Sequence, residues 1–228
     1  MYYLESKDFK KVVSLFKPCC LIDEIMFDGI FAKSNLKMMN KYNKAIKIMK
    51  KIKKERDKLF LYEKFLIHIP DYLNLTNKTF KSLMLKKGYI NIDWRFYLAI
   101  MAVSVNKCKY LITCLEELFI FYGGDKNWLI YGMKVVPEKL QKIAKLNDLM
   151  AHQPIELQIN HLQELINTNN LYHSWNINEI VHASAILFHF QKLSSFSNCL
   201  NIELPVCLCS EPDPFSYSPK EKGIFSNK

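Results

Sequence analysis

The first regular pattern along the chain is a basic amphipathic repeat between residues 33 and 58. Its apolar side chains recur at alternating spacings of four and three, which is the period of one helix face. These positions are Met38, Tyr42, Ala45, Met49 and Ile52. The pattern predicts an amphipathic helix with solvated lysines. Its apolar face either packs on the protein's own core or binds a membrane surface or a partner.

From Phe60 onward the pattern is helical almost throughout, and few stretches alternate with the period of two that is typical of strands. Breaks occur at Pro70, Gly88, Gly123–Gly124, Pro137 and Pro154. Three segments between these breaks are predicted to be core helices. The first, DWRFYLAIMAVSV, begins with Asp93 as a candidate N-cap and is continuously apolar, as a buried helix is.

The second segment, PEKLQKIAKLNDLMAH, has Pro137 in its first turn, and the third is WNINEIVHASAILFHFQKLSSF. Each places apolar residues on one face. In the second these are Leu140, Ile143, Leu146, Leu149 and Met150, and in the third Ile180, Ala183, Ile186 or Leu187, and Phe190. The expected fold class is therefore all-α.

The chain is expected to have three parts. Residues 1–59 hold the basic helix, 60–202 form one compact helical domain, and 203–228, rich in proline and serine, are a disordered linker or tail. With 228 residues, half of them hydrophobic, the chain can bury one good-sized core and should fold without metal or disulfide. Its seven cysteines lack zinc-type spacing, so free thiols, no metal and no cofactor are expected.

The net charge of +10 comes almost entirely from residues 33–58, where ten lysines and one arginine face two acidic residues. A nucleic-acid-binding domain typically spreads positive charge over a folded face, so nucleic acid is not the favoured partner. A basic-helix binder of nucleic acid or membrane surfaces remains an alternative, with affinity falling steeply with salt. The apolar runs are too short for a membrane span, and the charged N-terminus is unlike a signal peptide, which predicts a protein that is cytoplasmic, or both cytoplasmic and nuclear.

The stretch NKCKYLITCLEEL carries the candidate chemistry. Lys107, Lys109 and a helix start capped by Asn106 would each lower the pKa of Cys108 and make it a faster nucleophile than the buried cysteines. Tyr110 could donate a hydrogen bond to a bound oxidant. No histidine, the usual proton carrier near neutral pH, lies close in sequence.

Other residues could complete or replace this site. His182 and His189 share a helix face and could bring an imidazole from another helix, or they could be ordinary core residues. Cys114 could be a resolving thiol, but it lies six residues from Cys108 on a rotated face, and a packed apolar thiol is the alternative.

From about Ile69 to Ile202 the chain resembles the N-terminal half of the sestrins, stress-inducible cytoplasmic proteins. Four blocks carry the resemblance, in order: WRFYLAIMAVSVNKCKYL, YGGDKNWL, PEKLQKIAKLNDLMAHQP and HSWNINEIVHASAILFHFQKLSSF. The resemblance implies a helical fold like that of the bacterial alkyl hydroperoxidase AhpD. It also implies a peroxidase motif, CxYxxxxH, whose cysteine is Cys108 and whose tyrosine is Tyr110. The position of the relay histidine is occupied by Leu115 in this chain. We therefore expect negligible peroxidase activity in the natural sequence and a gain of peroxidase activity in Leu115→His.

Sestrins continue, after a linker, into a second half that binds leucine and contacts the GATOR complex, through which they restrain target-of-rapamycin signalling. This chain ends at Lys228, inside a segment that resembles that linker, so the leucine site is expected to be absent. The resemblance implies a regulator of redox homeostasis and of responses to oxidative stress and amino-acid starvation, working through GATOR-type partners. The alternative is an oxidoreductase, a thiol-dependent alkyl hydroperoxide reductase using Cys108.

Overall fold

The computed structural model describes residues 36–56, 59–166 and 174–202, with side chains from 43 to 55 in the first range. Every regular element in these ranges is helical, which confirms the all-α prediction. The predicted tail at 203–228 lies outside the described residues. The α-helices are α3 (Leu36–Arg56), α4 (Leu61–Phe65), α5 (Pro70–Phe80), α6 (Ile92–Val105), α7 (Lys109–Phe121), α8 (Lys126–Tyr131), α9 (Glu138–His152), α10 (Ile159–Ile166) and α11 (Ile177–Cys199).

Short helical turns join some of these helices. A π-helical turn, η2, continues α5, and 3-10 turns follow α4, α8 and α9. The turns are η1 (Leu66–His68), η2 (Lys81–Leu85), η3 (Gly132–Lys134) and η4 (Pro154–Glu156). None of the helices within the described ranges combines the length and the apolar character needed to cross a bilayer.

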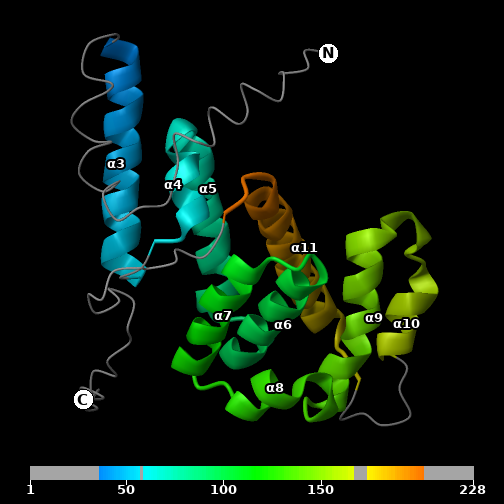
Figure 1. Cartoon of the computed structure of the whole chain (residues 1–228). Helices are drawn as coiled ribbons and strands as arrows, with labels where there is room; N and C mark the ends of the chain where they lie inside the picture. Colours follow the sequence, from blue (N-terminus) through cyan, green and yellow to red (C-terminus); the bar gives the residue numbers. More distant parts are fainter. Residues whose placement is uncertain (1–35, 57–58, 167–173, 203–228) are drawn as a thin grey trace.

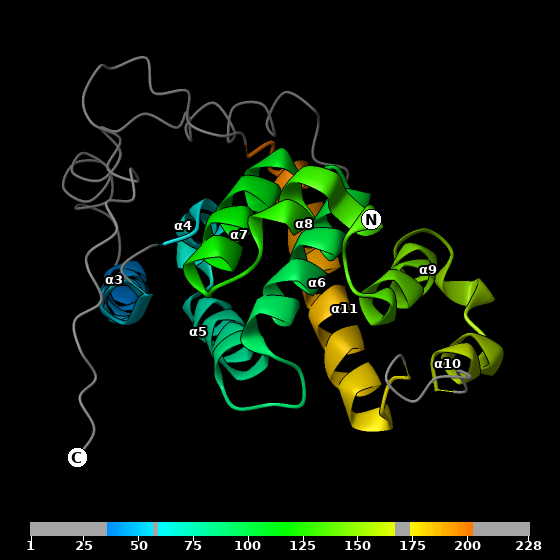
Figure 2. The same ribbon diagram turned by 90° about the horizontal axis from the view of Figure 1, so that it is seen from below.

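Helix α6 is the centre of the fold, packed between α7 and α11 (Figures 1 and 2). Between Arg95 and Val103 every residue except Met101 is buried, as its continuous apolar sequence predicts. The predicted N-cap is wrong, because α6 begins at Ile92 with Asn91 as its cap. Asp93 lies instead in the first turn, where its carboxylate is still favourable to the helix dipole.

Helices α9 and α11 bury most of the apolar positions that their spacing predicts, but Leu149 and Met150 of α9 are only half-buried. Leu140 and Ile143 of α9 are buried, and so are Ile180 and Phe190 of α11. The two helices are joined at the start of α11, where the buried indole of Trp175 donates from Nε1 to the carbonyl oxygen of Lys139 at 2.8 Å.

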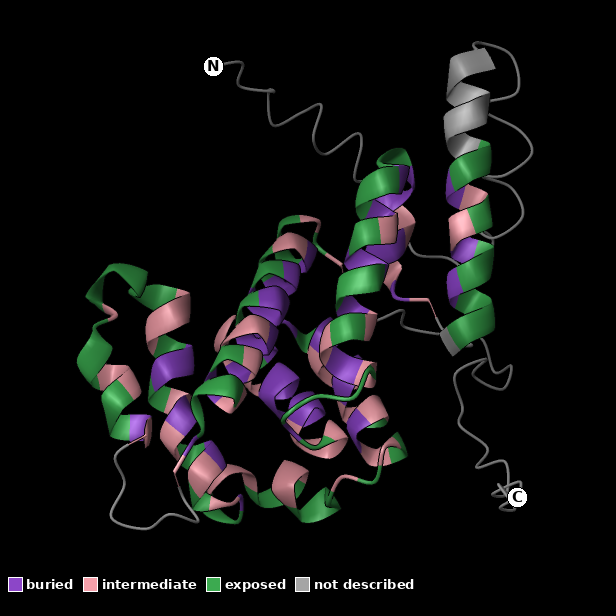
Figure 3. Cartoon of the chain, turned by 180° about the vertical axis from the view of Figure 1, so that it is seen from behind, coloured by how far each residue is buried: buried purple, intermediate pink, exposed green. Residues whose placement is uncertain are grey.

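Helix α3 packs on α5 and η1 at one edge of the molecule (Figures 1 and 3). Ala45, Met49 and Ile52 are buried and belong to the same hydrophobic core as the rest of the chain. Of the two interpretations of this apolar face, packing on the protein's own core is therefore correct for these three residues. Met38 and Tyr42 lie outside the described side chains.

Arg95 is buried at the start of α6 and holds the segment that leads into that helix. Its Nε donates to the carbonyl oxygen of Ile90 at 2.7 Å. Its Nη1 donates to the carbonyl oxygens of Lys86, Met84 and Leu83 at 2.6, 3.2 and 3.3 Å. The guanidinium thus satisfies carbonyl groups that the end of η2 leaves without helical partners.

A buried polar network ties α6, α9 and α11 together. The Gln191 side chain donates from Nε2 to the carbonyl oxygen of Asn147 at 2.9 Å and to its Oδ1 at 2.8 Å. The Asn147 side chain in turn donates from Nδ2 to the carbonyl oxygen of Met101 at 3.1 Å. Because buried amides are costly when unpaired, this chain of bonds fixes the relative heights of the three helices.

We expect Gln191→Leu to lower the free energy of unfolding by about 1–3 kcal/mol, because it leaves the buried Asn147 Oδ1 without its hydrogen-bond donor. Urea denaturation followed by circular dichroism measures the change. The matched control is Gln163→Leu, an exposed position on α10, which should change stability by less than about 0.5 kcal/mol. Equal effects of the two variants would show that the network does not stabilise the fold.

Candidate thiol site at the α6–α7 turn

The turn that carries Cys108 is a Schellman-type end of α6. The Lys107 N–H donates to the carbonyl oxygen of Ser104 at 2.9 Å, and the Cys108 N–H donates to that of Val103 at 3.2 Å. Lys107 occupies the left-handed region that this motif requires, with φ 52°. Asn106 is therefore the C-cap of α6, and Cys108 itself is the N-cap of α7. The prediction that Asn106 caps the start of α7 is wrong.

Asn106 fixes this turn against α11. Its Nδ2 donates to Ser194 Oγ at 2.7 Å and to the carbonyl oxygen of Gln191 at 3.3 Å. The Asn198 side chain donates from Nδ2 to the Asn106 carbonyl oxygen at 2.8 Å. The same Gln191 residue that holds α9 thus also holds the turn, so the backbone around Cys108 is constrained from several sides.

Cys108 is buried, with only 2% of its surface exposed. Burial disfavours the charged thiolate and raises the pKa of Cys108, although the backbone N–H of Leu111 favours the thiolate and opposes this shift. Lys107 and Lys109 are both exposed, so water screens their charges. The expectation that these lysines lower the pKa of Cys108 is therefore wrong.

Tyr110 is buried and its hydroxyl is engaged with α4. The hydroxyl oxygen accepts a hydrogen bond from the Leu61 N–H at 2.6 Å. That N–H is at the first position of α4, where no helical partner exists, so Tyr110 completes the start of α4. Burial, with the nearby Cys114 thiol as a second cause, raises the pKa of Tyr110 well above its usual value of 10.

Cys114 and Leu115 lie on the buried side of α7. Cys114 is one helical turn beyond Tyr110 and near its hydroxyl, so it is packed in the core. Leu115, at the position of the family's relay histidine, is 0% exposed. An imidazole placed there by Leu115→His would need a buried hydrogen-bond partner. We therefore expect that variant to be less stable than the natural chain, so that any gain of a proton donor comes with a loss of stability.

His182 and Cys108 lie at opposite ends of α6. The His182 ring contacts the segment before that helix: a Cβ on Gly88 would lie 2.6 Å from its Cε1 and 2.9 Å from Arg95 Nη2. Its Nε2 is 2.9 Å from the carbonyl oxygen of Leu83 and donates to it. Since α6 rises about 1.5 Å per residue, His182 is on the order of 20 Å from Cys108. It does not supply the missing relay group.

His189 is a core histidine. It is buried and its ring packs edge-on against Phe190, with ring centroids 5.2 Å apart. Its Nε2 has no hydrogen-bond partner within the described part of the chain. Burial, together with the nearby charge of Lys192, lowers the pKa of His189 from 6.5 to about 4, so the ring is neutral at physiological pH.

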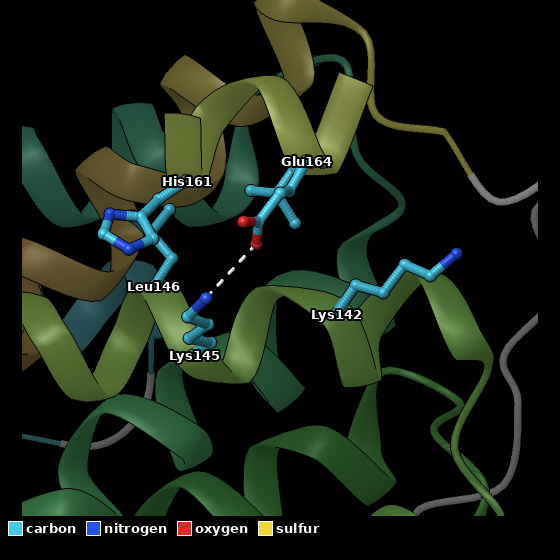
Figure 4. A pocket seen from close by; sticks show the side chains of 6 residues that line it. Lys142, Lys145, Leu146, His161 and Glu164 are labelled. Carbon is cyan, nitrogen blue, oxygen red and sulfur yellow. Dashed lines mark hydrogen bonds and ion pairs between the residues drawn. The ribbon is translucent and has the colours of Figure 1, made fainter. Parts of the chain in front are cut away.

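A small pocket lies between α9 and α10 (Figure 4). Its volume is about 210 Å³, below the several hundred that ligand sites usually have. The Lys145 ammonium points to Glu164 at 3.3 Å across it. It is lined by Lys142, Lys145, Leu146, His161, Glu164 and Leu165, none of which was predicted as a site residue, although Leu146 was predicted to face the core. In the ranges with described structure, no cluster of His, Cys, Asp or Glu could hold a metal ion.

These observations define the class of the protein. It is an all-α domain built around two consecutive helices, α6 and α7, whose connecting turn carries a buried cysteine. Residues 30–221 match the profile of the family described as PA26 p53-induced protein (sestrin). The chain therefore belongs to the sestrin family. It is 37% identical over 127 residues to mouse Sestrin-2 and 34% identical over 128 residues to Sestrin-1 of Xenopus laevis.

The Sestrin homolog of Drosophila melanogaster is 41% identical over 109 residues, which are 48% of this chain and 21% of that protein. The mouse and frog matches each cover 56% of this chain and 26% of the relative. The aligned part of the chain thus spans about a quarter of the length of these curated relatives.

We expect Cys108 to react with a maleimide more slowly than the exposed Cys199, because its thiol is buried and its raised pKa keeps the thiolate fraction low. Mass spectrometry of peptides after timed labelling at pH 8 measures both rates in one sample. Labelling in urea, where burial is lost, is the control and should bring the two rates together. Faster labelling of Cys108 in the folded chain would contradict the buried site.

The low pKa of His189 predicts an acid-dependent loss of stability. Between its unfolded value of 6.5 and about 4, the unfolded chain binds a proton that the folded chain does not. The free energy of unfolding should therefore fall as pH drops through this window, by up to about 3 kcal/mol from this group. Urea denaturation at several pH values measures the slope. His189→Leu should flatten it, whereas His152→Gln, at an exposed position, should not.

Proposed function

We propose that this chain is a sestrin-type regulator of stress and nutrient signalling that works through protein contacts. In this proposal it contributes to the restraint of target-of-rapamycin signalling through GATOR-type partners, in the cytoplasm or in both cytoplasm and nucleus, under oxidative stress and amino-acid starvation. The observation that carries the proposal is the match of residues 30–221 to the sestrin family. Helical domains that act through contacts need a shaped surface and not a reactive group.

The geometry of the α6–α7 turn supports contact over peroxide chemistry. Reduction of a peroxide requires a thiolate to attack the O–O bond and a donor to protonate the departing oxygen. At this turn the Cys108 thiol is buried with a raised pKa, and position 115 holds a leucine. The Tyr110 hydroxyl, the remaining member of the motif, accepts a hydrogen bond from α4.

A thiol-dependent alkyl hydroperoxide reductase is the alternative function. The observation in its favour is the place of Cys108 at the N-cap of α7, where the N–H of Leu111 favours the thiolate. This alternative requires the turn to open, because both the thiol and the tyrosine are buried in the described conformation.

The two functions are separated by measuring partner capture and peroxide consumption with the same protein preparations. We expect the immobilised chain to capture purified GATOR complex through a surface of its helical domain, in addition to the contact that the resemblance assigns to the second half of sestrins. We expect Cys108→Ser to capture the complex equally well. We expect peroxide consumption by the unmodified chain to be no faster than by Cys108→Ser. Cys199→Ser is the matched control for loss of an exposed thiol. Failure to capture the complex, combined with peroxide turnover that Cys108→Ser abolishes, would favour the reductase.

A further inference from the structure

The outward side of α3 carries a row of lysines at helical spacing. Lys47, Lys50, Lys51 and Lys54 are exposed and follow the i, i+3, i+4, i+7 pattern that places side chains on one face. We call these four residues the lysine face. It lies opposite the buried face of α3, and α3 stands at the edge of the molecule, so the lysine face points away from the domain (Figures 1 and 3).

Two ion pairs flank the lysine face, and neither is formed by its four lysines, although Lys51, after Lys81, also helps to lower the pKa of Glu55. Lys44 Nζ lies 2.6 Å from Asp71 Oδ1 of α5, and Glu55 pairs with Lys81 of η2. These pairs and the apolar face hold α3 on the domain. None of the four lysines forms an ion pair with an acidic residue whose position is described.

This arrangement has an electrostatic cost. Lysines three or four residues apart on one helix repel one another, and the lysine face contains four such pairs. The repulsion would be relieved by a partner that brings negative charge to several of these ammonium groups at once. A row on one straight helix can touch a flat partner with all four groups together.

We propose that the lysine face docks the protein on an anionic membrane surface. Clustered lysines on an amphipathic helix are typical of attraction to acidic lipid headgroups. Because Ala45, Met49 and Ile52 of α3 are already buried in the protein core, docking through this part of the helix is electrostatic and superficial, with no insertion of these apolar side chains between lipids. This inference is independent of the proposed signalling function.

Charge complementarity favours a membrane surface over nucleic acid. The four residues of the lysine face include no arginine and no aromatic side chain, and by sequence spacing Tyr42 and Arg56 of α3 fall in line with the apolar positions instead. The planar fork of arginine suits phosphates and bases, and aromatic rings stack on unpaired bases. Lysine alone supplies mobile point charges, which suit a fluid layer of headgroups.

The test uses the full chain and sedimentation with vesicles, either of pure phosphatidylcholine or of phosphatidylcholine containing phosphatidylserine. We expect binding only to the anionic vesicles, falling steeply as salt rises from low to physiological concentration. Each lysine near an anionic surface contributes about a fivefold factor, so the triple variant Lys47→Gln/Lys50→Gln/Lys54→Gln should lose affinity on the order of 100-fold.

The matched control is Lys86→Gln/Lys126→Gln/Lys134→Gln, which removes the same charge from exposed lysines on other elements. It should lose no more than a few-fold. Absence of binding to anionic vesicles, or an equal loss in both triple variants, would overturn the proposal. Anisotropy with duplex DNA and single-stranded RNA completes the test: tighter binding to either, lost in the α3 variant, would assign the face to nucleic acid instead.

Discussion

The side-chain amide of Gln191 is the point at which three helices of this protein are held in register. It donates both to the backbone and to the side chain of Asn147 on α9, and Asn147 reaches the backbone of α6. The backbone carbonyl oxygen of Gln191 accepts hydrogen bonds from Asn106, at the end of α6, and from Ser194 and Ser195 on α11. An apolar core alone would allow small axial shifts between helices, whereas buried amides are satisfied at one relative height only.

The position of the Cys108 turn is a consequence of this network. Asn106 is bound to α11, so the left-handed residue after it and the adjoining thiol have little freedom. The three residues at the positions of the family's peroxidase motif each have a structural role. Cys108 begins α7 from a buried position, Tyr110 completes α4, and Leu115 fills the core. Such packing stabilises a surface for binding more readily than it supports a thiol that must react with a diffusing oxidant.

Sequence periodicity predicted the core helices because apolar spacing reports burial directly, as the buried faces of α9 and α11 illustrate. The caps were not predicted correctly. Asparagine is favoured at helix starts, but Asn106 bonds to a helix that is some 85 residues away in sequence, and nothing local reveals this. The same applies to Gln191 and Asn147. In the sequence they are only polar residues within apolar patterns, and nothing there reveals that they bond to each other. Arg95 would also be expected at the surface from its residue type, whereas in the structure it is buried and donates to four carbonyl groups.

The sequence also located the charge but not its role. Nearly all of the excess charge falls in or near α3, whereas Ala45, Met49 and Ile52 of the same helix belong to the domain core. A helix that is only tethered would bind an anionic surface without fixing the orientation of the domain attached to it. Because α3 is packed on α5 and held by ion pairs with Asp71 and Lys81, a surface bound to its lysines would orient the whole helical domain. The face of the domain opposite α3, formed by α9 and α10, would then be directed away from the membrane and toward other proteins (Figure 1).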